Sequence, residues 1–195
     1  HSCATLPQAA TMTLMKNDIA TVLVTSEQIQ QAVEKLGRQL TAEYQSKNPL
    51  VIGVLRGAAP FMVDLIRTMD CPLEIDFIDV SSYGEATESS GTVTILKDVD
   101  SQVAGRHVLL IEDIVDTGQT LQKLLELFNA RGAATVKVCS LLDKPERRIA
   151  PVQADYVGLT IPNEFVVGYG LDFRQHYRNL PYIGVLKPEV YQAAA

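Results

Sequence analysis

Apolar residues recur along the chain with two periods, and the alternation of these periods predicts the fold class. Ser26 to Gln45 has apolar residues at helical spacing, with Ser26 as the expected N-cap, and residues 60–69 and 117–131 follow the same period. Other runs are apolar almost throughout and are expected to be buried strands: 50–55, 73–80, 92–96, 107–113 and 134–142. Apolar strands separated by helices predict an α/β fold with a mostly parallel twisted sheet, covered by helices on both faces.

In sheets of this kind, ligands bind beyond the carboxyl ends of the strands. The most informative segment is 108–128, in which an apolar strand meets several polar residues and then a helix: Glu112, Asp113, Asp116, Thr117, Gly118, Gln119 and Thr120. Gly118 permits a tight turn, and free N–H groups and threonine hydroxyls at the helix start can face a phosphate. The carboxylates would repel a phosphate, so we expect them to face sugar hydroxyls or a divalent cation. Each acid taken alone is equally well explained as a strand end or a helix cap.

Composition and charge narrow the function classes. The 195 residues are expected to form one domain, and 17 basic against 23 acidic side chains give a net charge of −6. That balance argues against an extended nucleic-acid-binding surface. The sequence contains neither a Walker A motif nor a GxGxxG fingerprint, which argues against the two commonest nucleotide-binding loops.

The cysteines and the apolar runs bear on the compartment. Cys3, Cys71 and Cys139 are far apart and form no CxxC pair, so we expect neither disulfides nor a zinc site, and a cytoplasmic location. No run approaches the ~18 apolar residues that span a bilayer, so no membrane association is expected. Residues 16–18 interrupt the apolar stretch near the N-terminus, so we expect no signal peptide.

Three acids, a glycine and two threonines between a buried strand and a helix are the pattern of the phosphoribosyl pyrophosphate (PRPP) loop of type I phosphoribosyltransferases. Further motifs follow in matching order and spacing: VLRGA (54–58), SSYG (81–84), LLDK (141–144) and IPNEFVVGYGLDF (161–173). From about Ser26 to about Pro188 the sequence resembles the bacterial hypoxanthine-guanine phosphoribosyltransferases. The resemblance implies the type I phosphoribosyltransferase fold, with a small hood built from the N- and C-terminal segments.

The same resemblance implies an activity. Ribose 5-phosphate would move from PRPP to hypoxanthine and/or guanine, with Mg²⁺, giving IMP and/or GMP and releasing pyrophosphate, which is a purine-salvage reaction. It implies one domain over 1–195, with 1–20 and 189–195 peripheral or disordered and 81–91 acting as a flexible lid. It also implies a homo-dimer or homo-tetramer.

Roles in the PRPP loop are carried over residue by residue. Glu112 and Asp113 would hold the ribose hydroxyls directly or through a metal, and residues Thr117 to Thr120 would hold the 5-phosphate. Asp116 would approach the purine N7 and could accept a proton from the base as its N9 attacks. The metal ligands implied are Glu112, Asp113 and Asp172.

The resemblance also implies which residues, elsewhere in the chain, would bind the pyrophosphate of PRPP. Arg56 and Gly57 follow the first buried strand at a junction that often carries a non-proline cis peptide in the family, where many relatives have Lys in place of Arg56. Ser82 and Tyr83 match lid residues, and Arg178 matches an arginine that pairs with pyrophosphate oxygens. Taken alone, both arginines could be surface residues and the lid could be a disordered surface loop.

The purine would be read by residues from the last two motifs. Lys144 matches a lysine that donates to the purine 6-oxo group, and an ammonium, which has donors and no acceptor, suits hypoxanthine or guanine better than adenine. Phe165 matches the aromatic residue that stacks on the base, with Val166 beside it and Asp172 nearby. Taken alone, Lys144 could be a solvated turn residue and Phe165 a core residue.

Alternative functions remain open at this point. A xanthine- or guanine-preferring transferase fits almost as well. A regulator of the same fold that senses nucleotides and binds nucleic acid should show a basic patch, which the charge does not favour. A nucleotide-binding domain of unrelated chemistry would not need the base-reading set of Lys144, Phe165 and Asp172.

Overall fold

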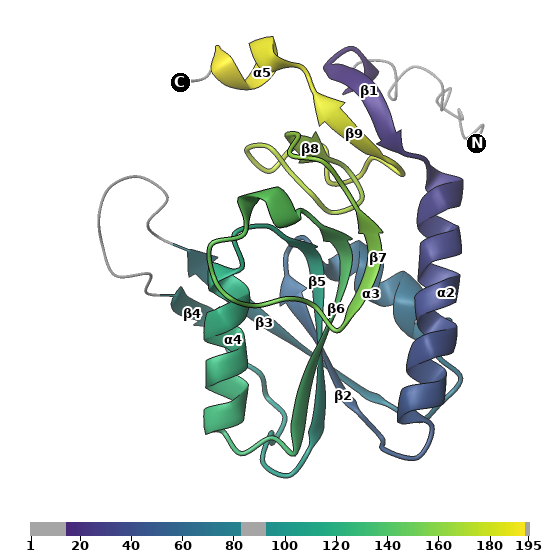
Figure 1. Cartoon of the computed structure of the whole chain (residues 1–195), viewed down its shortest axis with the longest axis vertical. Coiled ribbons are helices and arrows are strands. Elements are labelled where there is room, and N and C mark those ends of the chain that lie inside the picture. Colours follow the sequence, from purple (N-terminus) through teal and green to yellow (C-terminus); the bar gives the residue numbers. More distant parts are fainter. Residues whose placement is uncertain (1–14, 83–92, 194–195) are drawn as a thin grey trace, which may run out of the picture.

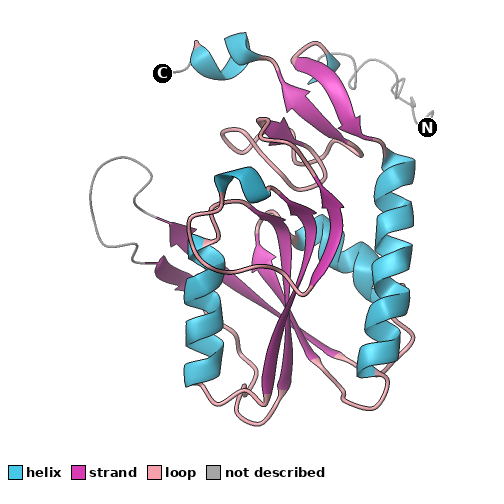
Figure 2. Ribbon diagram, in the orientation of Figure 1, coloured by secondary structure: helices cyan, strands magenta, loops and turns pink. Residues whose placement is uncertain are grey.

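The structure is a computed structural model that describes residues 15–82 and 93–193 and consists of two sheets with flanking helices (Figures 1 and 2). The larger sheet has the strand order β4-β3-β2-β5-β6-β7. All neighbours in it are parallel except β4, which pairs antiparallel with β3 at the edge. Its strands are β2 (Leu50–Leu55), β3 (Glu74–Ser82), β4 (Val93–Lys97), β5 (His107–Val115), β6 (Thr135–Asp143) and β7 (Tyr156–Thr160). The predicted mostly parallel sheet is confirmed.

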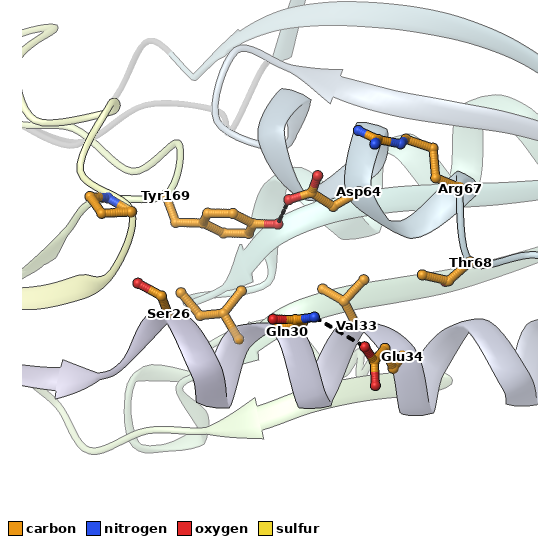
Figure 3. A pocket seen from close by; sticks show the side chains of 10 residues that line it. Ser26, Gln30, Val33, Glu34, Asp64, Arg67, Thr68 and Tyr169 are labelled. Carbon is orange, nitrogen blue, oxygen red and sulfur yellow. Dashed lines mark hydrogen bonds between the residues drawn. The ribbon is translucent and has the colours of Figure 1, made fainter.

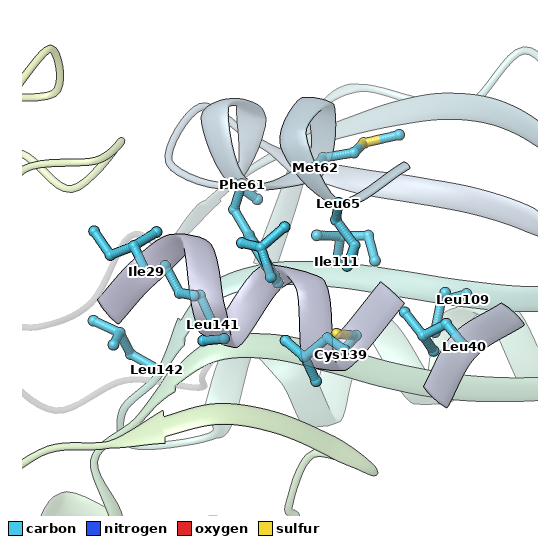
Figure 4. Close-up of a cluster of buried hydrophobic side chains, with 14 of the residues drawn as sticks. Ile29, Leu40, Phe61, Met62, Leu65, Leu109, Ile111, Cys139, Leu141 and Leu142 are labelled. Atoms are coloured by element: carbon cyan, nitrogen blue, oxygen red, sulfur yellow. The ribbon is translucent and has the colours of Figure 1, made fainter. Parts of the chain in front are cut away.

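Helices cover this sheet on both faces because the strands alternate their apolar side chains between two cores. Leu109 and Ile111 of β5 pack with helices α2 (Ser26–Tyr44) and α3 (Ala59–Ile66), as Figure 4 shows. Val108 and Leu110 of the same strand pack with α4 (Gln119–Ala130) on the opposite face. A parallel sheet buried on both sides explains why its strands read as continuous apolar runs.

A second, three-stranded antiparallel sheet has the order β1-β9-β8 and forms the hood. Its strands are β1 (Ile19–Val24), β8 (Val166–Val167) and β9 (Ile183–Leu186), followed by helix α5 (Pro188–Gln192). The hood has a small core of its own, with Val167, Leu180 and Leu186 buried. Figure 1 shows it over the end of the larger sheet where β5 and β6 finish. The hood implied by the resemblance is confirmed.

Two element boundaries differ from the sequence prediction for local reasons. The N-cap of α2 is Thr25 and not Ser26, because Gln28 lies three residues after Thr25 and completes a capping box with it. The hydroxyl of Thr25 accepts from the Gln28 backbone N–H at 3.2 Å, and the Gln28 side chain accepts from the Thr25 N–H at 2.9 Å. Helix α3 ends at Ile66, three residues before the predicted end at Met69.

The region around the PRPP loop also differs in its boundaries. Strand β5 continues to Val115, because Ile114 and Val115 still pair with Leu142 and Asp143 of β6. Helix α4 begins at Gln119 and not at Thr117, because Gly118 adopts a left-handed conformation with φ of 80°. The acids at 112 and 113 therefore lie within a strand that holds them rigidly.

Candidate active site

Most predicted site residues gather at the carboxyl ends of β2, β5 and β6, below the hood. The hood contributes the loop 168–178, which folds back onto the start of α3. Gly170 and Gly57 meet so closely that a side chain at 170 would overlap the Gly57 carbonyl, and one at 57 would overlap the carboxylate of Asp113. Glycine at both positions thus lets three distant chain segments converge on one carboxylate.

The centre of the site is a pair of adjacent carboxylates at the end of β5. Glu112 is 7% exposed and Asp113 is half-buried. Burial raises the pKa of Glu112 well above its usual range, and the neighbouring charge of Asp113 raises it further. Burial likewise raises the pKa of Asp113 to about 6, although the Ile114 N–H, which donates to its Oδ1 at 2.7 Å, opposes this. Carboxylates whose pKa is raised in this way become easier to ionise when a further cation lies close by.

Asp172 and Arg178 bring charge from the hood to the same place. Arg178 lowers the pKa of Asp113 and Asp172 raises it, so both side chains act on that carboxylate. Arg178 Nη2 lies 3.2 Å from Asp172 Oδ1, and its Nη1 donates to the Gly170 carbonyl at 2.6 Å. The structure therefore brings together Asp113, Asp172 and Arg178, which the sequence analysis assigned to metal and pyrophosphate.

Arg56 lies at the exposed edge of this group, directly after β2. The peptide bond between Leu55 and Arg56 is cis, one bond before the Arg56–Gly57 junction at which the resemblance implied it. Arg56 Nη1 donates to Gln175 Oε1 at 3.2 Å, and Arg178 Nη2 donates to the same oxygen at 3.1 Å. Both predicted pyrophosphate arginines are thus joined through Gln175.

The PRPP loop encloses a small cavity of about 130 Å³. It is lined by Glu112, Ile114, Val115, Asp116, Thr117, Gly118, Thr120 and Leu121. Gly118, the N-cap of α4, has no side chain to occupy the first free N–H groups of that helix, which therefore face outward as anion donors. A helix start of this kind suits a phosphate group, as the sequence predicted.

Lys144 and Asp116 lie side by side, directly after the ends of β6 and β5. Lys144 is 5% exposed, and its Nζ donates to the Glu164 carbonyl at 2.9 Å and lies 3.9 Å from Asp116 Oδ2. Burial lowers the pKa of Lys144, an effect that Asp116 opposes and Arg147 strengthens. Asp116 Oδ1 is buried and has no hydrogen-bond partner in the part of the chain that the structure describes. A base-sized ligand at this point would find one donor and one acceptor next to each other.

Phe165 and Val166 form the hood side of this region. Phe165 stacks on Tyr191 of α5, with ring centroids 4.8 Å apart and 15° between the planes, and meets Phe173 edge-on. It remains 40% exposed, which is unusual for a core phenylalanine and leaves ring surface for a ligand. Val166 is buried in the strand pair β8–β9, so only its backbone is available for contact.

The groups described above do not include every predicted site residue. Tyr83 and the side chain of Ser82 lie outside the described residues, as does most of the predicted lid 81–91. Gln119 is exposed on the first turn of α4. Within residues 15–82 and 93–193, no three His, Cys, Asp or Glu side chains converge as a metal-binding cluster. Glu112, Asp113 and Asp172 therefore form no ready-made three-ligand cluster, although Asp172 raises the pKa of Asp113.

Arg147 and Arg148 are site residues that the sequence analysis missed. Arg148 binds the loop backbone, donating from Nε to the Asp116 carbonyl at 3.0 Å and from Nη1 to the Val152 carbonyl at 2.7 Å, and its Nη2 pairs with Asp143. Arg147 Nη1 lies 3.3 Å from Asp116 Oδ2. The only sequence signal was the charged run after Lys144, which is more typical of a solvated turn.

A larger cavity, of about 460 Å³, lies away from these groups, between α2, α3 and Tyr169 (Figure 3). The Tyr169 hydroxyl donates to Asp64 of α3 across it. None of the predicted site residues lines this cavity. Its contribution to the site is indirect, because the Tyr169–Asp64 bond anchors the loop that carries Gly170 and Arg178.

Comparison with known proteins identifies the class that this fold and site define. The model of the phosphoribosyl transferase domain matches residues 22–174, and the chain belongs to the phosphoribosyltransferase family. The family resemblance read from the motifs is confirmed. In the described residues, no helix is long and apolar enough to cross a membrane.

Within this family, the chain is similar to named hypoxanthine phosphoribosyltransferases and to one bifunctional protein. The hypoxanthine-guanine phosphoribosyltransferase of Bacillus subtilis is 58% identical over 180 residues, covering 92% of this chain and 100% of the relative. The crystal structure of a hypoxanthine phosphoribosyltransferase from Staphylococcus aureus superimposes with a TM-score of 0.88 at 54% identity, covering 91% of this chain and 97% of that one. The bifunctional protein TilS/HprT of Listeria innocua is 58% identical over 177 residues, covering 91% of this chain. The chain spans only 27% of that relative's length.

Proposed function

We propose that this chain transfers ribose 5-phosphate from PRPP to N9 of hypoxanthine and/or guanine, giving IMP and/or GMP and pyrophosphate. The observation that carries the proposal is the pair of buried Lys144 and half-buried Asp116, 3.9 Å apart beyond the carboxyl ends of β6 and β5. O6 and N7 of a 6-oxopurine lie on one edge of the base. An ammonium and a carboxylate side by side match that edge as donor and proton acceptor.

The purine would be selected by Lys144. Its Nζ donates to the Glu164 carbonyl and retains further donors for a ligand oxygen. The 6-oxo group of hypoxanthine or guanine accepts from an ammonium, whereas the amino group of adenine would face it with another donor. The exposed ring of Phe165 then supplies a stacking surface beside the base.

Asp116 would act as the general base. As N9 attacks the anomeric carbon of the ribose, the bond to pyrophosphate breaks and the base must lose the proton on its N7. The buried, unpartnered Oδ1 of Asp116 is an acceptor without a donor, which suits it to take that proton. Arg147 and Lys144 face Oδ2 of the same carboxylate and hold its orientation.

PRPP would lie across the ends of β2 and β5. Its 5-phosphate would occupy the cavity of about 130 Å³ at the start of α4, and its pyrophosphate would meet Arg56, Gly57 and Arg178. The ribose hydroxyls would face Glu112 and Asp113. The lid around Ser82 and Tyr83 would exclude water from the sugar as positive charge develops on it.

The donor set at the end of β5 fits Mg²⁺. Carboxylate oxygens are hard ligands, and Mg²⁺ in such sites commonly takes one or two protein carboxylates, with substrate phosphates and water completing its shell. Glu112 and Asp113 would hold one ion, and Asp172 would contribute on the pyrophosphate side. When bound, the ion would neutralise charge that develops on the departing pyrophosphate.

We also propose that the enzyme works in the cytoplasm as a homo-dimer or homo-tetramer. Free Cys71 and buried, unpaired Cys139 are consistent with a reducing compartment. Sedimentation analysis of the purified chain tests the assembly.

The test is pyrophosphate release from PRPP with Mg²⁺, run in parallel with hypoxanthine, guanine, xanthine and adenine. Release with hypoxanthine or guanine and none with adenine is the expected result. Release with xanthine and guanine alone would indicate a xanthine/guanine-preferring transferase. Absence of release with every base would refute the enzymatic function and favour a nucleotide-sensing regulator of the same fold.

A further inference from the structure

One side chain outside the predicted site, Gln175, holds both arginines of the pyrophosphate end. Its Oε1 accepts from Arg56 Nη1 at 3.2 Å and from Arg178 Nη2 at 3.1 Å. Guanidinium groups have donors only, so the amide atom between them has to be the oxygen. A neutral acceptor thus lies between two like charges, one of which comes from a segment 119 residues away.

The backbone conformation around Gln175 directs its side chain toward the two arginines. Arg174, Gln175 and Tyr177 have φ of 51°, 71° and 76°, in the left-handed region that residues other than glycine rarely adopt. The Gln175 N–H donates to Asp172 Oδ2 at 2.8 Å, and the other oxygen of Asp172 contacts Arg178. Strained conformations of this kind persist where surrounding contacts hold them, and they cluster at ligand sites.

We propose, resting on the proposed function, that Gln175 is a positioning residue that assembles Arg56 and Arg178 into one pyrophosphate-binding pair before PRPP arrives. The guanidinium groups of exposed Arg56 and half-buried Arg178 repel each other, and Asp172 and the Gly170 carbonyl already hold Arg178. Arg56 has several rotatable bonds, so without the Gln175 acceptor it would turn away from Arg178. Holding them in place beforehand removes an ordering cost from binding. The amide carries no charge, so it orders the arginines without cancelling their attraction for phosphate oxygens.

Four variants separate the effect of the Gln175 acceptor oxygen from the effect of its backbone conformation. Gln175→Leu keeps the size of the side chain and removes the acceptor. Gln175→Gly removes the acceptor and also relieves the positive φ, so its folding is protected. Gln175→Glu keeps an acceptor oxygen, and Gln39→Leu, at an exposed site on α2, controls for added apolar surface.

Steady-state kinetics and calorimetric titration with Mg²⁺-pyrophosphate give independent readouts. We expect Gln175→Leu and Gln175→Gly to raise the KM for PRPP and the Kd for pyrophosphate about ten-fold, the effect of one charged hydrogen bond. The KM for the purine and kcat should stay within about two-fold. Gln175→Glu keeps an acceptor oxygen but adds a negative charge that opposes phosphate, so its PRPP KM should lie between those of the wild type and Gln175→Leu. Gln39→Leu should match the wild type.

An unchanged PRPP KM and pyrophosphate Kd in Gln175→Leu or Gln175→Gly would overturn the inference. Equal losses in Gln175→Glu and Gln175→Leu would also overturn it, because the acceptor oxygen would then be irrelevant. If the wild type transfers ribose to no base, the proposed function fails. The pyrophosphate titration then still decides the role of Gln175 by itself.

Discussion

Two equally buried carboxylates of the main sheet behave in opposite ways. Asp76 of β3 and Glu112 of β5 are each 7% exposed, and only β2 separates their strands. Burial by itself acts to raise the pKa of both carboxyl groups. For Asp76, hydrogen bonds from Ser101, Phe77 and Asp100 outweigh burial, and its pKa is lowered. For Glu112, the charge of Asp113 adds to the effect of burial, and its pKa is raised well above its usual range.

The difference lies in what each carboxylate contacts. Asp76 accepts backbone N–H groups from Phe77 at 2.7 Å, Asp100 at 2.9 Å and Ser101 at 2.8 Å, so it fastens a loop to the sheet. Glu112 lines the cavity of the PRPP loop, and the charge of its neighbour Asp113 raises its pKa further. Burial alone therefore does not mark a functional acid, whereas burial without compensation does. Substitutions at Asp76 and in the PRPP loop test this contrast.

Asp116→Asn should have the largest effect of these substitutions, and it should change catalysis without changing stability. Asparagine keeps the shape of the side chain but cannot accept the purine proton, so kcat should fall by about 10²–10⁴-fold. The thermal midpoint should stay within about 2 °C of the wild type. Single-turnover kinetics and calorimetry measure both quantities, and near wild-type turnover would remove Asp116 as the base.

Asp76→Ala should have the opposite profile. Three backbone N–H groups would lose their acceptor, so the free energy of unfolding should fall by about 3 kcal/mol, as read from urea titration. The KM values of the folded enzyme should not change. Asp100→Ala, at a side chain that is 92% exposed, is the matched control and should lose little stability. A stable Asp76→Ala protein with altered kinetics would contradict this assignment.

Asp113→Asn should stabilise the protein, whereas Asp76→Ala should destabilise it. It removes one of two neighbouring negative charges and keeps the oxygen that accepts the Ile114 N–H. Without Mg²⁺ at pH 7, the free energy of unfolding of the variant should therefore be about 1 kcal/mol higher than that of the wild type. The same variant should bind Mg²⁺-PRPP poorly. Urea titrations in the presence of a chelator measure the stability. A less stable variant would show that the acid pair is structural.

The smallest effect is a difference in pH dependence. The folded pKa of Asp113, about 6, lies above the unfolded value near ~3.9, so between these values the folded state binds more protons and its stability falls as pH rises. The stability gap between Asp113→Asn and the wild type should therefore be small at pH 4 and full at pH 7. Asp76, whose pKa is lowered, should contribute stability that is lost as pH falls below about 4. A gap for Asp113→Asn that is independent of pH would contradict the raised pKa.

The sequence predicted the main sheet well because its strands are apolar on both faces. The runs 50–55, 107–113 and 134–142 could hardly form anything else in a chain of this size, and each is a central strand. The hood strands were not located individually. β8 has two residues and β9 has four, which is too short for any period to show.

The site residues that could be predicted from the sequence are those that belong to its motifs. Glu112, Asp113, Asp116 and Lys144 lie together because parallel strands β5 and β6 end at one edge, which the sequence pattern implies. Arg148 and Gln175 were not predictable. Their roles depend on tertiary hydrogen bonds to carbonyls and guanidinium groups, and in the sequence both lie within ordinary polar runs.

The most direct test of the account is calorimetric titration of PRPP into the wild type and Asp113→Asn, with Mg²⁺ and with a chelator. If Glu112 and Asp113 serve to receive a cation with its polyphosphate, the wild type should bind PRPP with Mg²⁺ and lose most of that affinity with the chelator. Asp113→Asn should bind weakly in both. Equal binding by the two proteins, or binding by the wild type that does not depend on Mg²⁺, would contradict the central claim.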